Sequence, residues 1–114
     1  MKIPKEIKVG ALTYQVLEID QVFCIDNKEV YGKIEYDFAK ISIRSDIQSR
    51  QRMELTLLHE VIHAITRDRG IDWGDDNENY TEGLARGIHA LIIDNPSMFK
   101  EVNNNGKSTN NDRG

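Results

Sequence analysis

The sequence predicts an α+β fold in which N-terminal antiparallel β-hairpins pack on a pair of helices. Two observations predict it: apolar and polar residues alternate in several short runs up to residue 44, and apolar residues recur at helical spacing in two later segments. With 114 residues, the chain can build one hydrophobic core but not two. We expect a single minimal domain over residues 1–102 and a disordered polar tail over residues 103–114, which has nothing to bury.

Two hairpins are expected in the N-terminal half. Residues 7–9 and 12–19 flank a glycine-containing turn, and residues 31–36 and 40–44 alternate on either side of a short connection. The segment between the hairpins is ambiguous. It contains Cys24 in an apolar context, where we expect a buried, inert thiol. As the only cysteine, it cannot form an intramolecular disulfide.

Two helices are expected in the second half. The first begins at about Ile47, with Ser45 or Asp46 as candidate N-cap, and ends at Gly70. The second runs from about Asn77 to Ile93, and residues 97–102 add one further turn. The residues expected on the apolar stripe of the first helix are Met53, Leu57, Leu58, Val61, Ile62 and Ile65. Those expected on the apolar side of the second are Tyr80, Leu84, Ile88, Leu91 and Ile92.

The most informative segment is His-Glu-Val-Ile-His over residues 59–63, inside the first predicted helix. Residues four apart on a helix lie one turn apart on the same face, so the rings of His59 and His63 can bind one ion. Glu60 can reach a water bound to that ion. This is the pattern of zinc-activated hydrolysis, and a random match in so short a chain is rare. The segment therefore predicts a Zn²⁺ site, with Glu60 as the catalytic residue.

A catalytic zinc site ordinarily has three protein ligands and a water, so a third ligand is needed. Metzincins take it six residues after the second histidine, but Arg69 occupies that position and Thr66 replaces their glycine. Glu78 and Glu82, four apart on the second helix, come near the histidines if the two helices pack antiparallel. One can ligate the metal and the other can accept a hydrogen bond from a ligating histidine. Both are also ordinary residues for the first turns of a helix.

These residues resemble the gluzincin metallopeptidases, and within them small phage and mobile-element members of the ImmA/IrrE-like family. The resemblance rests on residues 57–64 and, more weakly, on residues 77–85, and it covers roughly residues 1–100. It implies a zincin-type pair of helices, His59 and His63 as zinc ligands, and Glu60 as general base. It further implies Glu78 as third ligand and Glu82 as partner of a histidine. The short distance in sequence from His63 to Glu78 keeps Glu82 open as the ligand.

The resemblance implies an endopeptidase that acts on a peptide or protein substrate, for example a repressor-like protein. An exposed strand at residues 31–36 or 40–44 could hold such a substrate by strand addition. Larger relatives stabilise the oxyanion with a histidine or tyrosine, for which no motif exists here. Tyr36, Tyr80 and His89 are the candidates, and His89 is more typical of a structural histidine.

Composition excludes other classes of function. The net charge is −4 without a basic stripe, which disfavours nucleic-acid binding. The apolar runs are too short to cross a membrane, and the N-terminus does not resemble a signal peptide, so we expect a cytoplasmic protein. Two alternatives to a peptidase stay open: a non-catalytic zinc-binding domain, and an accessory module that acts by protein interaction. The sequence leaves the oligomeric state undetermined.

Overall fold

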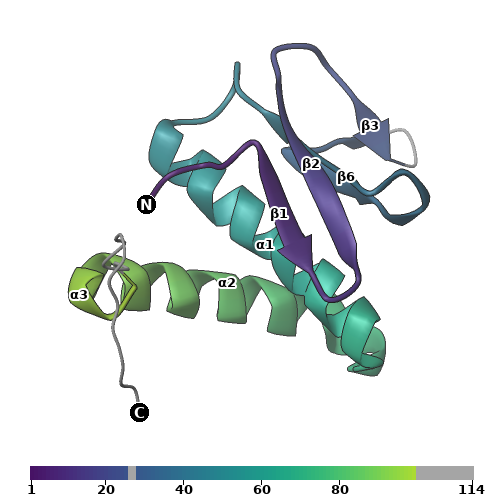
Figure 1. Cartoon of the computed structure of the whole chain (residues 1–114). Coiled ribbons are helices and arrows are strands. Elements are labelled where there is room, and N and C mark those ends of the chain that lie inside the picture. Colours follow the sequence, from purple (N-terminus) through teal and green to yellow (C-terminus); the bar gives the residue numbers. More distant parts are fainter. Residues whose placement is uncertain (26–27, 100–114) are drawn as a thin grey trace.

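The computed structural model describes residues 1–25 and 28–99, which form an α+β domain (Figure 1). A four-stranded mixed sheet and three helices make up the domain, and a two-stranded hairpin lies beside it. The strands are β1 (Glu6–Val9), β2 (Leu12–Ile19), β3 (Cys24–Ile25), β4 (Lys28–Glu29), β5 (Gly32–Glu35) and β6 (Lys40–Arg44). The helices are α1 (Arg50–Arg69), α2 (Asn77–Asp94) and α3 (Pro96–Phe99), with 3-10 turns η1 (Tyr36–Phe38) and η2 (Gly74–Asp76). The tail predicted over residues 103–114 lies outside the described residues.

Both predicted hairpins are confirmed, but the sheet is mixed rather than purely antiparallel. Strands β1 and β2 pair antiparallel, and so do β5 and β6. The two hairpins join through β2 and β6, which run parallel, so the strand order is β1-β2-β6-β5. The strands that carry the most buried apolar side chains therefore occupy the centre, and the shorter β1 and β5 form the edges.

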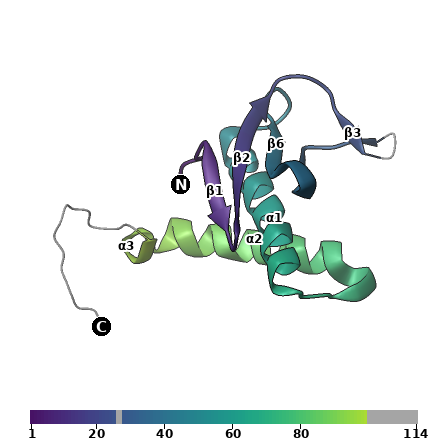
Figure 2. The same cartoon turned by 45° about the vertical axis from the view of Figure 1, so that its right-hand side comes forward.

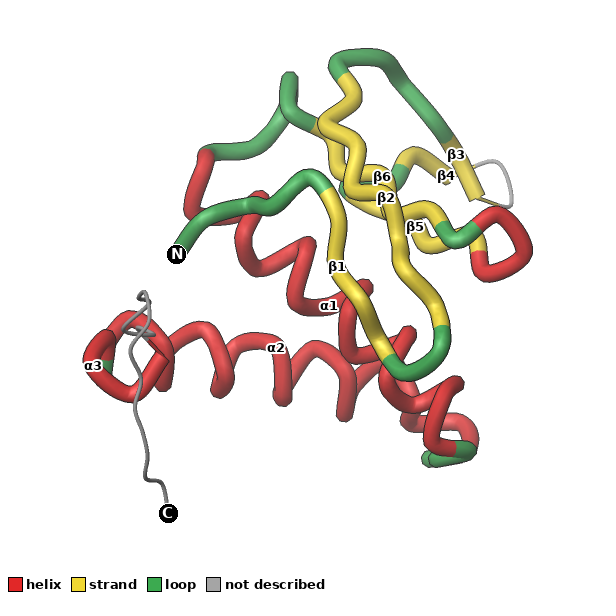
Figure 3. The backbone as a smooth tube through the Cα atoms, in the orientation of Figure 1, coloured by secondary structure: helices red, strands yellow, loops and turns green. Residues whose placement is uncertain are grey.

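One face of the sheet packs on α1, and α2 runs back across α1 on the side away from the sheet (Figures 1 and 2). The tube in Figure 3 shows the same order of strands, first helix and second helix. Helix α1 is therefore covered on two sides. The core comprises Tyr14, Val16, Ile41, Ile43, Met53, Leu57, Val61 and Ala64. Ile65, expected on the apolar stripe of this helix, is instead 40% exposed.

Helix α1 begins three residues later than predicted. Ser49 is the N-cap, and its hydroxyl accepts a hydrogen bond of 3.1 Å from the backbone N–H of Arg52. Asp46 does not cap the helix because its carboxylate binds the guanidinium of Arg44, at 2.7 and 2.9 Å. The predicted end is confirmed, since Gly70 adopts the left-handed conformation at the C-cap, with φ of 68°.

Helix α2 has nearly the predicted length, but the prediction of its buried side is correct only in part, since Ile88 and Ile92 are half-buried and the other three residues are exposed. Leu84 and Leu91 are each 45% exposed and Tyr80 is 52% exposed, although we expected all three to face the core. The buried residues of this helix are instead Thr81, Ala85 and His89. Small and polar side chains line this face because α2 packs closely on α1 and brings functional groups toward it, as described below.

The hairpin of β3 and β4 corrects a further prediction. These strands have two residues each and, among the described residues, pair only with one another, so they cover little surface. Cys24 is consequently exposed rather than buried. The turn predicted over residues 97–102 is observed in part as α3, and residues 100–102 lie outside the described residues. Among the described residues, no helix combines the length and apolar character required to cross a membrane.

Candidate metal centre

The two helices bring the predicted metal ligands to one place. His59 and His63 lie on successive turns of α1, and Glu78 lies in the first turn of α2. The loop between the helices turns sharply, with the backbone N–H of Gly74 donating to a carboxylate oxygen of Asp72 at 2.8 Å. Helix α2 then runs antiparallel to α1. Its first turns therefore face the middle of α1, where the motif lies.

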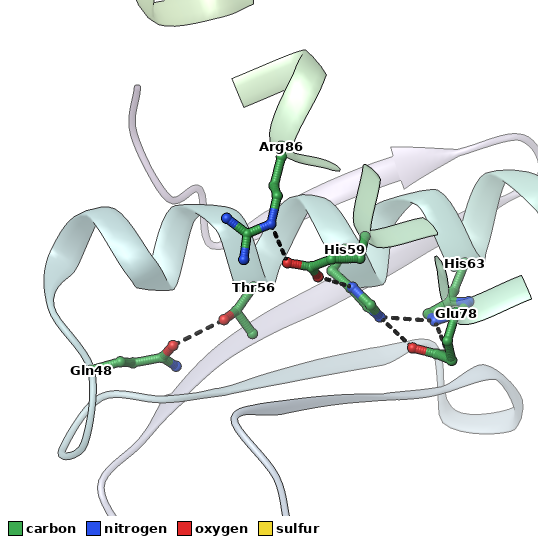
Figure 4. Close-up of polar contacts among 7 residues, drawn as sticks. Gln48, Thr56, His59, His63, Glu78 and Arg86 are labelled. Atoms are coloured by element: carbon green, nitrogen blue, oxygen red, sulfur yellow. Dashed lines mark hydrogen bonds and ion pairs between the residues drawn. The ribbon is translucent and has the colours of Figure 1, made fainter. Parts of the chain in front are cut away.

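Three ligand atoms converge within this region (Figure 4). One carboxylate oxygen of Glu78 lies 2.9 Å from His59 Nε2, and the other lies 2.9 Å from His63 Nε2. The two Nε2 atoms are 3.2 Å apart. Since the Glu78 carboxylate is the one that reaches both Nε2 atoms, the geometry favours Glu78 over Glu82 as the third ligand.

These separations can be compared with those around a tetrahedral metal ion. With bond lengths of about 2.1 Å from zinc to nitrogen or oxygen, two ligand atoms of a tetrahedron lie about 3.4 Å apart. The observed separations of 3.2, 2.9 and 2.9 Å are shorter than that value, and the two shorter ones involve different carboxylate oxygens of Glu78. Two imidazoles and one carboxylate are also the set found in open catalytic zinc sites, where a water takes the fourth position.

Glu82 lies behind the ligands and fixes the orientation of one of them. Its carboxylate lies 2.9 Å from His59 Nδ1 and also binds the Nε of Arg86 at 2.8 Å. Burial raises the pKa of Glu82, but the hydrogen bonds and charges of His59 and Arg86 outweigh it, and the pKa falls below its ordinary value. An ionised Glu82 can accept a hydrogen bond from His59 Nδ1, an arrangement in which Nε2 is available to bind a metal.

The cluster brings two imidazole rings and a carboxylate to one place. His59 Nε2 faces a carboxylate oxygen of Glu78 at 2.9 Å, and its Nδ1 faces a carboxylate oxygen of Glu82 at 2.9 Å. Burial lowers the pKa of His63, which opposes the protonated form of the second ring. A divalent metal ion could accept an electron pair from each of the three groups.

Glu60 is buried beside the ligands without being one of them. Its side chain is on the neighbouring position of α1, and the residue is only 7% exposed. Burial raises the pKa of Glu60 to about 7, and the charge of Glu78 adds to this effect while that of His59 opposes it. A carboxyl group that titrates near neutrality can both accept and return a proton at physiological pH.

The ligands and Glu60 open into a cleft of about 680 Å³ between α1, the start of α2 and strand β5. Apolar side chains from the β3–β4 region and from β5 line the opposite wall, namely Ile25, Val30 and Ile34. Strand β5 forms an edge of the sheet, as the predicted substrate strand must. Strand β6, the other candidate, pairs on both sides with β2 and β5, so the prediction of an exposed edge at residues 40–44 is wrong.

Of the three candidates for oxyanion stabilisation, one lies at the cleft. Tyr36 lines the cleft, and the guanidinium of Arg67 lies 4.2 Å from the centre of its ring. Burial and the Glu60 carboxylate raise the pKa of Tyr36, so its hydroxyl keeps its proton. Tyr80 packs against Trp73 and is half exposed, and His89 binds the buried carboxylate of Glu54 at 2.8 Å.

Sequence reasoning missed the residues that support this site. Arg86 could have been found, since it lies four residues after Glu82 on the same helix face. No sequence pattern identifies Gln48 and Thr56, because their hydrogen bond joins a loop to a helix. The closeness of Gly32 to Glu60 also depends entirely on how β5 packs on α1.

No protein family model matches the chain, and no curated protein and no solved structure matches it either.

Proposed function

We propose that this protein is a zinc-dependent metallopeptidase of the endopeptidase type. The observation that supports this most is the convergence of ligand atoms of His59, His63 and Glu78 within 4.8 Å of one another, beside a buried carboxyl group, Glu60, at the wall of an open cleft. The resemblance of residues 57–64 to gluzincins points to the same activity.

Each residue of the site has a separate role in hydrolysis. Zinc bound at the three ligands would acidify a water and polarise the carbonyl of the scissile peptide bond. Glu60 accepts the proton of the attacking water and passes it to the leaving amine, for which its raised pKa is suited. Tyr36 donates a hydrogen bond to the carbonyl oxygen as negative charge develops on it. Strand β5 holds the peptide extended along the cleft.

The Glu60→Gln variant tests this assignment. Gln has nearly the same shape as Glu but cannot carry the proton, so peptide hydrolysis should fall to background while the zinc content stays at one ion per chain. The exposed Glu6 on β1 provides a matched control, and Glu6→Gln should keep full activity. Activity of Glu60→Gln at the level of the unchanged protein would refute the proposal.

Two observations bear on the alternatives. A structural zinc site has four protein ligands, whereas the ligand group found among the described residues has three, His59, His63 and Glu78. This disfavours a purely structural zinc domain. The exposed leucines on α2, Leu84 and Leu91, favour a second candidate function, binding of another protein through that helix. Alanine at both positions should then abolish such binding and leave hydrolysis intact.

A further inference from the structure

Gln48, in the loop between β6 and α1, joins three parts of the structure through one side-chain amide. Its Nε2 donates to the backbone carbonyl of Arg44 at 2.7 Å and to that of Tyr31 at 3.2 Å. Its Oε1 accepts a hydrogen bond of 2.9 Å from the hydroxyl of Thr56 on α1 (Figure 4). The end of β6, the residue before β5 and helix α1 are thereby held together.

The hydrogen bond between Gln48 and Thr56 lies near the proposed catalytic residue, Glu60. Thr56 lies one helical turn before Glu60, on the same face of α1. Gly32, the first residue of β5, lies so close to α1 that an added Cβ would be 2.5 Å from Thr56 Cγ2 and 3.5 Å from a carboxylate oxygen of Glu60. The edge strand therefore touches α1 directly beside Glu60, which a larger residue at position 32 would prevent.

We propose that Gln48 is a positioning residue for peptide hydrolysis, which fixes the distance between the substrate-binding edge of β5 and Glu60. The inference rests on the proposed function. In its sheet, β5 has one neighbouring strand, β6, so its other anchor is its contact with α1. A peptide added to the outer edge of β5 moves with that strand, and the Gln48 amide keeps the scissile bond in reach of Glu60.

The length of the substrate separates this role from a merely structural one. A peptide of about eight residues can pair along β5, whereas a blocked dipeptide substrate has too few backbone groups to do so. In Gln48→Ala, kcat/KM for the longer peptide should fall about tenfold, mainly through kcat, as expected when the bound scissile bond is less well placed relative to Glu60. For the dipeptide it should change by less than about twofold, because that substrate depends on the metal site alone.

Substitutions of Thr56 separate the hydrogen bond from packing. Thr56→Val keeps the methyl group against Gly32 but cannot donate to Gln48, so it should reproduce Gln48→Ala. Thr56→Ser keeps the donor and loses the methyl group, so it should retain activity on the longer peptide. Combining Thr56→Val with Gln48→Ala should cost no more than either alone, since both break one connection. Gln51→Ala, at an exposed glutamine in the first turn of α1, is the matched control.

The outcomes are distinct. Selective loss on the longer peptide in Gln48→Ala and Thr56→Val, with zinc content unchanged, supports the inference. Equal losses on both substrates, or no loss on either, would overturn it while leaving the peptidase proposal in place. If the unchanged, zinc-loaded protein cleaves neither substrate, the proposed function and this inference both fail. Thr56→Val preserves shape and serves as the test if Gln48→Ala does not fold.

Discussion

The buried carboxyl group of Glu60 should destabilise the metal-free protein above neutral pH. Its pKa rises from an ordinary value of 4.5 to about 7 on folding, mainly because of burial. The folded state thus binds this proton more tightly than the unfolded state does. The associated stability is complete below pH 4.5 and is lost as the pH rises through about 7. At about 1.4 kcal/mol per pH unit, the loss amounts to about 3 kcal/mol.

Replacing Glu60 with Gln removes this loss, because the amide is neutral at every pH. Glu60→Gln should therefore raise the free energy of unfolding by about 3 kcal/mol at pH 8 and leave it nearly unchanged at pH 4. A gain of that size is a large part of the stability of a small domain, which is about 5–15 kcal/mol. Urea unfolding of both proteins with a chelator present measures it at each pH.

Glu54→Gln provides the control, since it makes the same chemical change on the same helix. Glu54 is 9% exposed, close to the 7% of Glu60, but its carboxylate binds His89 Nε2 at 2.8 Å. Losing that charged hydrogen bond should lower the free energy of unfolding by about 1 kcal/mol. The reasoning is refuted if Glu60→Gln is no more stable than the unchanged protein at pH 8, or if its gain is equally large at pH 4.

Three further predictions address the ligands, the oxyanion and the edge strand. Competition with a chromophoric chelator should show that Glu78→Ala weakens zinc binding at least about 100-fold, because a ligand is lost. Glu82→Ala should weaken it about 10- to 100-fold, because the hydrogen bond that orients His59 is lost. Steady-state cleavage by Tyr36→Phe should show kcat lowered about 100-fold at unchanged zinc content. Urea unfolding should show that Gly32→Ala costs about 1–3 kcal/mol, because the added methyl group overlaps Thr56.

Each of these predictions has a control and a contradicting result. Asp75→Asn removes a negative charge near the start of α2 and should leave zinc affinity unchanged. If Glu82→Ala loses more zinc affinity than Glu78→Ala, Glu82 and not Glu78 is the ligand. Tyr31→Phe, at a second tyrosine lining the cleft, should keep its kcat. If Tyr31→Phe lowers kcat as much as Tyr36→Phe does, Tyr36 has no special role in stabilising the oxyanion. Gly83→Ala meets nothing within 4 Å and should stabilise α2 slightly, so similar effects at Gly32 and Gly83 would contradict the packing argument.

The features that sequence predicts well here are those set by near neighbours in the chain. Alternation over a few residues is enough to identify the hairpins, and four-residue spacing on a helix is enough to bring His59 and His63 together. Gly70 ends α1 because only a residue tolerant of positive φ suits that C-cap. In each case the physical cause lies within one or two turns of the residue concerned.

The features that sequence missed depend on residues far apart in the chain. The pairing of β2 with β6 follows from which strands share a core, and no local pattern records it. Asp46 has the ideal chemistry for an N-cap, but the buried Arg44 guanidinium binds it, and Ser49 takes the role. The connection from Gln48 to Tyr31 spans 17 residues, so its effect on the edge strand becomes visible only in three dimensions.

The partly wrong prediction for α2 has a cause in the site itself. At about 100° per residue, Glu78, Glu82 and the buried Ala85 project within about 60° of one another, and Leu84 projects about 100° or more away from each of them. Burying the leucine side against α1 would have turned both carboxylates away from the histidines. The helix instead buries small and polar residues and leaves its leucines exposed, at a cost in apolar burial. At functional sites, the arrangement of side chains often departs from the local sequence pattern. The exposed leucines of α2 are such a departure, and they support the metal-site proposal independently of the motif.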